Sequence, residues 1–441
     1  MSYTETSKSA APAASGRANV GPLVMQAPLK FRVHTRAYTD PAVFETEMER
    51  VFSSTWVYVA HQSEIPKIGD FKTTHVGLQP VIVTHGADNN FNVMVNRCVH
   101  RGSVVCREAR GNATEFSCPY HGWVYTIDGK LAGVSERRDP GSYGEHFEPP
   151  EGLFRLPRIE SYRGLIFASF NAQVPPLLEF LGRTKNIIDR KLNLSPSGEI
   201  VLKSRPYVSR YKGNWKFQYE NLVDPYHFMH THKGFVQLQF KYGDTTGDFG
   251  VHKGGSVKDM RAIRLRGASW SCKYGHAVLE KPAPSPDPFL SGEYGDFYGK
   301  LKVQHGDEEF LKIAGQGSTA VFPNLGMIHQ QLRVWRPIAV DLTEVTVYPY
   351  ELKDAPDSYN EGMLRSQERF YGPAGYGQAD DAEVFSLNQQ GLAGTALDWL
   401  ILERGIETDV LDESGDYRGM PASEAPQRAL WREWTRLMGE G

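Results

Sequence analysis

The chain has 441 residues, which allows one to three domains and a sizeable buried core. Its 49 lysines and arginines nearly balance its 52 aspartates and glutamates, and the formal net charge of −3 excludes a strongly basic nucleic-acid-binding protein. The 43 glycines and 27 prolines show no period, so we expect many turns and a β-rich component rather than a helical bundle.

Four cysteines are too few for a disulfide scaffold in a chain of this length. The N-terminal region lacks a basic segment followed by an apolar one, and no apolar run is long enough to cross a membrane. We therefore expect a cytoplasmic protein without a membrane span. Cysteines in a reducing compartment tend to be metal ligands or reactive thiols, but Cys106 and Cys272 lie outside the motifs below and are expected to be inert.

Residues 1–22 are rich in Ser, Ala, Thr and Gly and are predicted to be a disordered leader. Residues 23–55 form an N-terminal arm whose apolar residues predict a helix over 41–53. Residues 56–170 contain short strand-like runs between Gly, Asp and Asn turns and predict a small all-β domain. The clearest of these runs are at 80–84, 91–96 and 165–169.

Residues 171–441 mix helical and strand patterns, so the whole chain is expected to be of the α+β class, with an antiparallel sheet flanked by helices in this second domain. Helices are expected at 177–189, 214–230, 358–369, 380–390 and 423–438, the last with Ser423 as N-cap. Strands are expected at 200–211, 317–321, 327–335 and 343–349. Gly-, Asp- and Pro-rich loops are expected at 240–260 and 278–300.

Two pairs of cysteine and histidine lie in the all-β domain, Cys98 with His100 and Cys118 with His121. Each pair offers one thiolate and one imidazole from a tight loop, whereas a Cys2His2 zinc finger separates its cysteines from its histidines. Mixed pairs suit a cluster of two irons in which two cysteines hold one iron and two histidines hold the other. The pattern resembles the Rieske [2Fe–2S] domain, and the resemblance covers residues 56–170.

A second group of metal-ligand residues lies between Glu220 and His232, where three histidines and two acids are crowded together. Two histidines and one carboxylate on one side of an iron leave positions open for oxygen and substrate. On an ideal helix His227 and His230 are neighbours, while His227 and His232 need a distortion to converge. Helix geometry alone therefore favours His230.

The same segment is similar to the mononuclear-iron motif of Rieske ring-hydroxylating oxygenase large subunits, with matches at Glu220, Asp224, His227 and His232. This resemblance extends from about residue 35 to the end of the chain. It implies His227 and His232 as iron ligands, with His230 a bystander. The stretch 371–383 resembles the family's Gly-Pro-Ala-Gly-x5-Asp signature and implies Asp381 as third ligand, with Asp380 and Glu383 as alternatives.

The resemblance also implies a function. Electrons pass from NADH through a reductase, in some members with a ferredoxin, to the Rieske cluster and then to mononuclear Fe(II), where O2 is inserted into an aromatic ring. Family members are α3β3 assemblies with a small β subunit, or α3 homotrimers. In them an acid at the position of Asp224 connects the mononuclear iron to a Rieske histidine of the adjacent subunit, which matches His121 or His100 here.

The glutamate–aspartate spacing and the strand around Arg333 resemble family members that act on aromatic acids of the benzoate, salicylate, terephthalate and indole-acetate types. Arg333 could bind a substrate carboxylate through a bidentate pair of hydrogen bonds, or could belong to a structural ion pair. Near the predicted iron, the side chains expected to contribute to the substrate pocket are those of Asn221, Val223, Met229, Phe235 and Tyr371.

Three alternatives stay open from the sequence. A Rieske monooxygenase or demethylase would carry the same two metal sites, because substrate pose decides the outcome. A non-catalytic Rieske electron-transfer protein would not need His227, His232 and Asp381. A zinc-binding structural protein would be colourless and free of iron.

Overall fold

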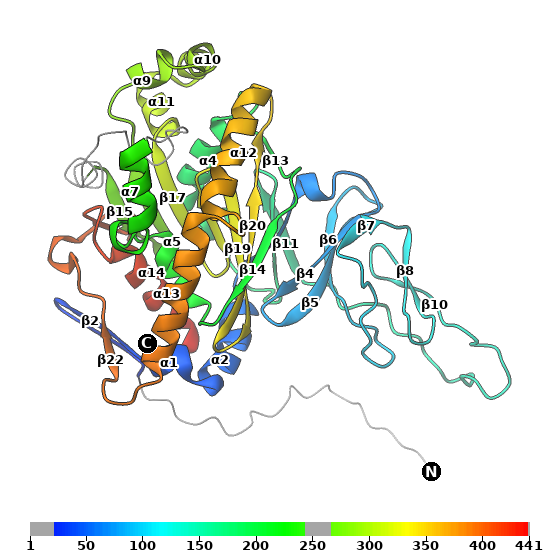
Figure 1. Cartoon of the computed structure of the whole chain (residues 1–441). Coiled ribbons are helices and arrows are strands. Elements are labelled where there is room, and N and C mark those ends of the chain that lie inside the picture. The colour runs from blue at the N-terminus through cyan, green and yellow to red at the C-terminus, as the bar shows by residue number, and fades with distance from the viewer. Residues whose placement is uncertain (1–21, 243–265, 440–441) are drawn as a thin grey trace.

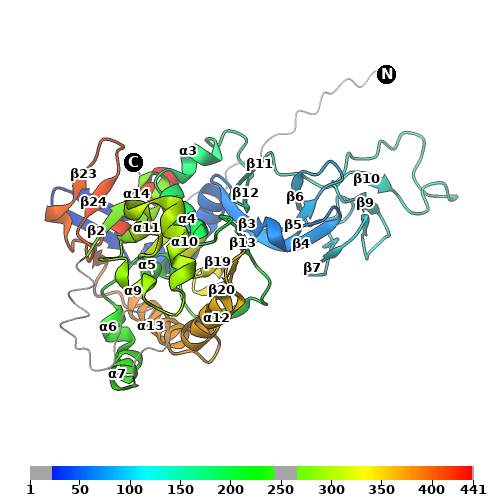
Figure 2. The same cartoon turned by 90° about the horizontal axis from the view of Figure 1, so that it is seen from above.

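The computed structural model describes residues 22–242 and 266–439. Figures 1 and 2 show a large body of sheet and helices from which a smaller β-rich part projects at one side. The predicted leader at 1–22 and the predicted loop at 240–260 lie almost entirely outside the described residues. No helix within the described ranges has both the length and the apolar character that a membrane crossing requires.

Three antiparallel sheets build residues 56–170. The largest has the order β6-β5-β4-β7, formed by Phe91–Val95, Gln79–His85, Asp70–Val76 and Arg110–Asn112. The second has the order β10-β9-β8, formed by Leu131–Gly133, Val124–Thr126 and Glu115–Ser117. The third has the order β11-β12-β3, formed by Arg158–Tyr162, Leu165–Ser169 and Val57–His61. The strands predicted at 80–84, 91–96 and 165–169 are thereby confirmed as β5, β6 and β12.

One nine-stranded antiparallel sheet organises the large body. Its order is β14-β20-β19-β18-β17-β16-β15-β24-β23, formed by Tyr207–Tyr211, Leu342–Pro349, Gln331–Ala339, Leu325–Ile328, Gln316–Val321, Ala277–Lys281, Ala268–Ser271, Tyr417–Gly419 and Val410–Leu411. Alternate residues of each strand point to opposite faces, so the sheet separates two hydrophobic cores. One core contains Ala320 and Trp335, and the other contains Val321 and Leu332.

Helices cover both faces of this sheet. On the face of Trp335 lie α5 (Lys216–Leu222) and α14 (Ala425–Met438). On the face of Leu332 lie α3 (Leu177–Leu181), α4 (Thr184–Asn193), α10 (Gly295–His305) and α11 (Asp307–Ile313). The remaining helices of the body are α6 (Phe228–Thr231), α7 (Lys233–Tyr242), α9 (Asp287–Leu290), α12 (Asp357–Tyr371) and α13 (Tyr376–Leu392). This arrangement confirms the predicted α+β class.

The N-terminal arm lies against the body. Its β1 (Val24–Ala27) and β2 (Lys30–His34) form a sheet with β22 (Trp399–Ile401), and α1 (Arg36–Thr39), α2 (Pro41–Glu47) and a π-helical turn (Met48–Phe52) follow. A two-stranded sheet joins β13 (Ile200–Val201) to β21 (Glu351–Leu352). Short 3-10 turns at Gln62–Glu64, Lys273–Gly275 and Ile406–Thr408 complete the elements.

Several predicted elements are wrong in their limits because turns interrupt them. The strand expected at 327–335 is two strands, β18 and β19, joined by a tight turn at His329 and Gln330. The helix expected at 177–189 breaks at Gly182, whose positive φ of 46° ends α3. The helix expected at 214–230 ends at Leu222, and Pro225 follows, which cannot continue a helical hydrogen-bond ladder.

Three further expectations need smaller corrections. Of the strand expected at 200–211 only β13 and β14 form, because Pro206 interrupts the ladder before Tyr207. The loop expected at 278–300 instead holds the end of β16, the whole of α9 and the start of α10. Ser423 lies one residue before the cap position of α14, yet its hydroxyl still accepts a hydrogen bond from the Ala425 amide at 3.1 Å.

Two acids, Glu47 and Glu220, fix helix α5 between the N-terminal arm and α14. The Lys216 ammonium lies 2.5 Å from the Glu47 carboxylate, and both side chains are fully buried. One turn further along α5, the Glu220 carboxylate accepts hydrogen bonds from the Tyr38 hydroxyl and the Trp431 indole, both at 2.8 Å. The helix that leads into the predicted iron-binding segment is therefore held by elements from both ends of the chain.

Glu220 makes the stability of this region depend on pH. Burial raises the pKa of the Glu220 carboxyl to about 7, against the lowering effect of its donors Trp431 and Tyr38 and of Lys216. The folded state thus holds this proton more tightly than the unfolded state does. The stabilisation of the folded state by protonated Glu220 is complete below about pH 4.5 and is lost as the pH rises through about 7.

Glu220→Gln should remove this dependence while keeping both accepted hydrogen bonds on the amide oxygen. Between about pH 4.5 and pH 8, we expect the free energy of unfolding of the variant to rise relative to wild type by roughly 3 kcal/mol, measured by denaturant unfolding. The half-exposed Glu199 offers a matched control, and Glu199→Gln should follow the wild-type curve. Parallel curves for Glu220→Gln and wild type would contradict the prediction.

Candidate active site

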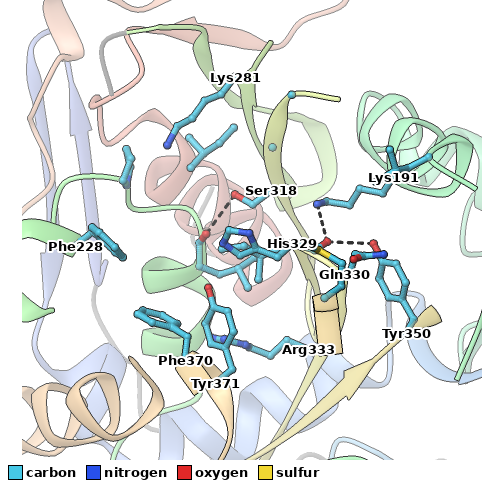
Figure 3. A pocket seen from close by; sticks show the side chains of 18 of the residues that line it. Lys191, Phe228, Lys281, Ser318, His329, Gln330, Arg333, Tyr350, Phe370 and Tyr371 are labelled. Atoms are coloured by element: carbon cyan, nitrogen blue, oxygen red, sulfur yellow. Dashed lines mark hydrogen bonds between the residues drawn. The ribbon is translucent and has the colours of Figure 1, made fainter. Parts of the chain in front are cut away.

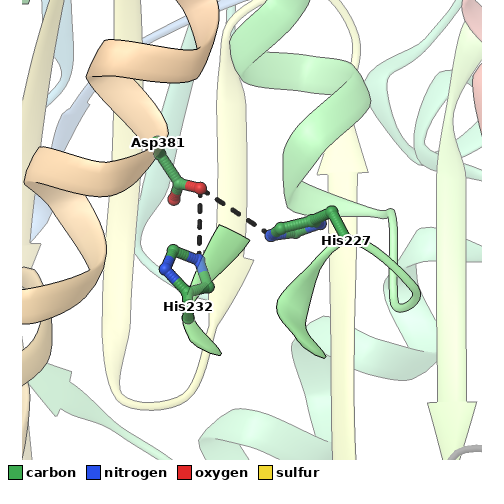
Figure 4. A group of neighbouring side chains, drawn as sticks. All are labelled: His227, His232 and Asp381. Atoms are coloured by element: carbon green, nitrogen blue, oxygen red, sulfur yellow. Dashed lines mark ion pairs between the residues drawn. The ribbon is translucent and has the colours of Figure 1, made fainter. Parts of the chain in front are cut away.

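Two histidines and an aspartate converge beside the large sheet. His227 immediately precedes the single turn of α6, His232 immediately follows it, and Asp381 comes from α13 (Figure 4). One ligand atom from each residue lies within 4.8 Å of those of the other two. The Asp381 Oδ1 atom is 3.2 Å from His232 Nε2 and 3.7 Å from His227 Nε2. These three residues can present one oxygen and two nitrogens to a single metal ion.

The end of helix α6 decides which histidine joins His227. His232 has φ −98° and ψ 31°, so the helix stops there and the ring turns inward, where it is 1% exposed. His230 stays on the outer side of α6 and is exposed. Because the helix does not continue regularly, a spacing of five residues converges and the spacing of three does not.

Acidic side chains face the outer nitrogens of both histidines. The His232 Nδ1 atom lies 3.2 Å from Asp380, and the His227 Nδ1 atom lies 3.7 Å from Asp224. Asp224 Oδ1 also accepts the backbone amides of Tyr226 at 2.8 Å and His227 at 3.2 Å. Metal-bound histidines usually donate their second N–H to an acid or a carbonyl, which fixes the ring and leaves Nε2 for the metal.

Charge at the site favours an ionised aspartate. Burial opposes ionisation of Asp381, but His232, His227 and Arg333 outweigh it and hold the pKa of the carboxyl below its usual value. Burial likewise opposes a charged His227, while Asp224 and Asp381 raise the pKa of its ring. The Nε2 atoms of the two imidazoles face the Asp381 carboxylate. These three donors suit Fe(II), which would keep further coordination positions open.

Asn221 lies among these groups. Its amide nitrogen donates to Asp381 Oδ1 at 3.0 Å and lies 3.3 Å from His227 Nε2. The residue is at the end of α5, the helix anchored by Lys216 and Glu220. The anchoring of α5 therefore places an amide directly beside two of the three candidate ligands.

The two cysteine–histidine loops are built alike, although their histidines are spaced differently. In each loop the cysteine amide donates to the carbonyl five residues later, from Cys98 to Ser103 and from Cys118 to Trp123, both at 2.8 Å. The second loop joins β8 to β9, and the first follows β6. Equivalent backbone hydrogen bonds set two cysteines in matching positions at the tips of neighbouring loops.

A glycine closes each of these loops. The amides of Gly102 and Gly122 donate back to the preceding cysteine carbonyls at 2.9 and 3.0 Å, and both residues have positive φ, 75° and 66°. The turn brings the rings of His100 and His121 to a centroid distance of 4.6 Å. The four side chains thus meet at one end of the small domain.

The donor atoms in these loops fit an iron–sulfur cluster. The Tyr125 hydroxyl lies 3.0 Å from Cys98 Sγ, as donors to cluster sulfurs do. Burial opposes ionisation of Cys118, but the backbone amides of Tyr120 and His121 bring the pKa of its thiol below its usual value. His100 Nδ1 is buried and has no hydrogen-bond partner among the described residues. A cluster would use the sulfurs and this nitrogen as ligands.

A cavity of about 310 Å3 runs from His227, His232 and Asp381 along the sheet (Figure 3). Of the residues predicted to bind substrate, Arg333, Asn221 and Tyr371 line it. Three others do not, and here the prediction needs correction. Val223 is fully buried in the core of the sheet, Phe235 packs behind the lining residue Phe370, and Met229 lies on α6 away from the lining.

Sequence reasoning missed much of the cavity. Its wall also contains residues from α4, from β16 and from the turn between β18 and β19, and these are separated from the iron motif by up to a hundred residues. No spacing in the sequence joins them, because only the packing of the sheet brings them together. They are Lys191, Lys281, His329 and Gln330; the wall also includes Phe228, which lies within the iron motif, and Phe370, which precedes Tyr371.

Comparison with known proteins gives a consistent result. Residues 55–147 match the Rieske [2Fe-2S] domain, and residues 198–440 match the ring hydroxylating alpha subunit (catalytic domain). The anthranilate 1,2-dioxygenase large subunit of Burkholderia cepacia is 43% identical, with 92% of this chain and 93% of the relative covered. The 2-halobenzoate 1,2-dioxygenase large subunit of Burkholderia cepacia is 33% identical, with 85% and 80% covered.

A solved structure of a naphthalene 1,2-dioxygenase variant bound to phenanthrene superimposes with a TM-score of 0.82 at 27% identity, over 95% of this chain and 94% of that one. The catalytic-domain match alone spans more than half of the chain, and both halves of the molecule have a counterpart in the family. The chain is therefore an oxidoreductase of the Rieske ring-hydroxylating oxygenase family, an α subunit with a [2Fe–2S] domain and a mononuclear-iron catalytic domain.

Proposed function

We propose that this chain is the terminal oxygenase of a multicomponent dioxygenase that acts on an aromatic acid. The observation that carries the proposal is Arg333 on β19, which is 2% exposed and lines the cavity. Its Nε and Nη2 atoms have no hydrogen-bond partner among the described residues. A buried guanidinium needs an anion, and a substrate carboxylate can supply two oxygens in the matching geometry.

The charges around the cavity support an anionic substrate. Burial and the neighbouring cations Lys191, Lys281 and Arg333 lower the pKa of His329 to about 3, so three positive charges lie near a neutral ring. The relatives point the same way, since their names state action on 2-halobenzoate, toluate and anthranilate. Product analysis with a panel of aromatic acids and a surrogate reductase tests the proposal.

Each residue has a separate task in this proposal. When bound, the cluster supplies single electrons and the mononuclear iron supplies the position at which O2 is reduced. Cys98, His100, Cys118 and His121 would hold the cluster. His227, His232 and Asp381 would hold the iron, and Arg333 would hold the substrate carboxylate so that the ring faces these ligands.

The proposed partners follow the family. We expect a reductase fed by NADH, with or without a ferredoxin, and an α3β3 assembly with a small β subunit, or otherwise an α3 homotrimer. The division into a leader at 1–22, an arm at 23–55, an electron-transfer domain at 56–170 and a catalytic domain at 171–441 belongs to the same proposal. Copurification and mass measurement of the assembly test the partners.

A monooxygenase or demethylase is the second candidate. The relatives include a salicylate 5-hydroxylase large component from Ralstonia sp. at 31% identity and an N,N-dimethyl phenylurea N-demethylase α subunit from Sphingobium sp. at 30% identity. The metal ligands are the same for both outcomes. Incorporation of one or two labelled oxygen atoms into the product distinguishes them.

Arg333→Met should raise KM for the aromatic acid about ten- to a hundred-fold, because a charged hydrogen bond worth about 1.5–3 kcal/mol is lost. Steady-state kinetics of the assembled enzyme measure this. Arg210, on β14, forms an exposed ion pair with Glu344, and Arg210→Met serves as the control that should leave KM unchanged. Unchanged kinetics in Arg333→Met would return this arginine to a structural role.

His232→Ala should lose the mononuclear iron and keep the Rieske cluster, since two of the three ligands are too few to hold the metal. His230→Ala is the matched control and should keep both metals, because His230 is exposed on α6. Iron analysis together with electron paramagnetic resonance of the reduced cluster measures both. The opposite pattern would mean that His230 is the ligand.

Asp224→Asn should keep both metals and still allow reduction of the cluster, yet turnover should fall by about a hundred-fold or more. The proposed reason is that Asp224, half-buried and 3.7 Å from His227 Nδ1, faces that ring and also accepts an N–H from a Rieske histidine, His121 or His100, across a subunit boundary. Single-turnover reoxidation of the cluster measures the transfer. Loss of iron in proportion to activity would show that Asp224 only orients His227, and normal turnover would contradict both roles.

A further inference from the structure

A tight turn forms the end of the cavity away from Phe228 (Figure 3). Ile328 of β18 pairs with Gln331 of β19, so His329 and Gln330 are the only residues of the turn. His329 has a positive φ of 48°, a conformation that costs energy for a residue with a side chain. Strained turns of this kind persist where the surrounding structure holds them, and they often serve a site.

Neighbouring elements hold the turn from two sides. The Lys191 ammonium of α4 and the Tyr350 hydroxyl both donate to the His329 carbonyl at 3.1 Å. The Tyr350 amide donates to the Gln330 carbonyl, also at 3.1 Å. The backbone of Gln330 is therefore fixed, and its side chain has a defined direction into the cavity.

The side chain of Gln330 lacks the partners that a buried amide needs. Gln330 is 5% exposed and lines the cavity, and neither its Nε2 nor its Oε1 atom has a hydrogen-bond partner among the described residues. Burying both atoms without a hydrogen-bond partner is unfavourable, because each has lost its hydrogen bonds to water. A bound molecule that both donates and accepts hydrogen bonds would remove this cost.

The charges around Gln330 indicate which chemical group of a bound molecule its amide contacts. Arg333 lines the cavity and is a buried cation with two unpartnered donors, so in the proposed function Arg333 takes the carboxylate of an aromatic acid. The Gln330 amide carries no charge and suits a neutral polar group. Its oxygen accepts from an O–H or N–H, and its nitrogen donates to a hydroxyl oxygen.

We propose that Gln330 forms hydrogen bonds with a second, neutral polar substituent on the ring, a hydroxyl or an amino group. Gln330 thereby selects hydroxy- or amino-substituted aromatic acids over unsubstituted or alkylated ones. The proposal rests on the proposed function, because it assumes that an aromatic acid occupies the cavity. Gln330 is on this view a specificity-determining residue. A site that hydrogen-bonds a substituent disfavours an analogue without it, because its buried groups then stay unpaired.

The test compares benzoate with its hydroxy, amino and methyl derivatives at each ring position. A methyl group has about the size of the polar groups and cannot hydrogen-bond, so it controls for shape. In the wild-type assembled enzyme, we expect at least one hydroxy or amino acid to bind ten-fold or more tightly than the methyl acid at the same position. Equal or tighter binding of every methyl acid would overturn the proposal without any variant.

Gln330→Met should remove the preference. We expect kcat/KM and binding affinity for the preferred substituted acid to fall about ten- to a hundred-fold relative to benzoate. Gln331→Met is the matched control, because the neighbouring Gln331 is also buried with an unpartnered amide yet does not line the cavity, and its preference should stay as in wild type.

The outcomes separate this inference from the proposed function. If Gln330→Met keeps the wild-type preference while Arg333→Met still weakens every acid, Gln330 does not read the substituent and the aromatic-acid function stands. If no aromatic acid binds to the wild-type enzyme and Arg333→Met changes nothing, the proposed function is wrong, and the inference about Gln330 falls with it. If Gln331→Met loses the preference as Gln330→Met does, the effect is one of packing and the proposal is wrong.

Discussion

The active site depends on a buried ion pair that joins the N-terminal arm to helix α5 and that the C-terminal helix α14 contacts through Trp434. Glu47 and Lys216 are both fully buried, and the indole N–H groups of Trp215 and Trp434 donate to the Glu47 carboxylate at 2.9 and 2.7 Å. A buried charge without partners is strongly destabilising, so the arm, α5 and α14 must assemble together. Helix α5 then leads directly into the segment with the candidate iron ligands His227 and His232. The positions of these ligands therefore depend on how α5 is held.

The ligand geometry follows from where helices stop. Helix α5 ends at Leu222 and α6 lasts a single turn, so His227 and His232 flank a helix instead of sharing a helical face. Regular helix geometry favours His230 and gives a different arrangement. Residue types and spacing could predict a metal site, but only the family resemblance indicated the register and Asp381, because α13 reaches the site through tertiary packing.

The sequence predicted most strands and helices but not the turns that shape the cavity. The segment 327–335 indicated one continuous strand, and nothing in it signals that His329 adopts a positive φ and divides the segment. Gln330 was therefore missed as a cavity residue. The opposite error occurred at Val223 and Phe235, where closeness in sequence to the iron motif suggested closeness to the cavity, while packing places both behind its wall.

The cavity wall carries charges of both signs. Asp224 and Asp381 lie beside the two candidate iron-binding histidines, where a bound metal cation would offset their negative charge. Arg333 lies near Asp381, yet its Nε and Nη2 atoms have no hydrogen-bond partner among the described residues, and Lys191 and Lys281 add positive charge around His329. The unpartnered donors of the Arg333 guanidinium attract the carboxylate of an aromatic acid that enters the cavity. In the proposed binding mode the carboxylate lies on Arg333 and the uncharged part of the ring faces the iron ligands, which is the orientation that ring hydroxylation requires.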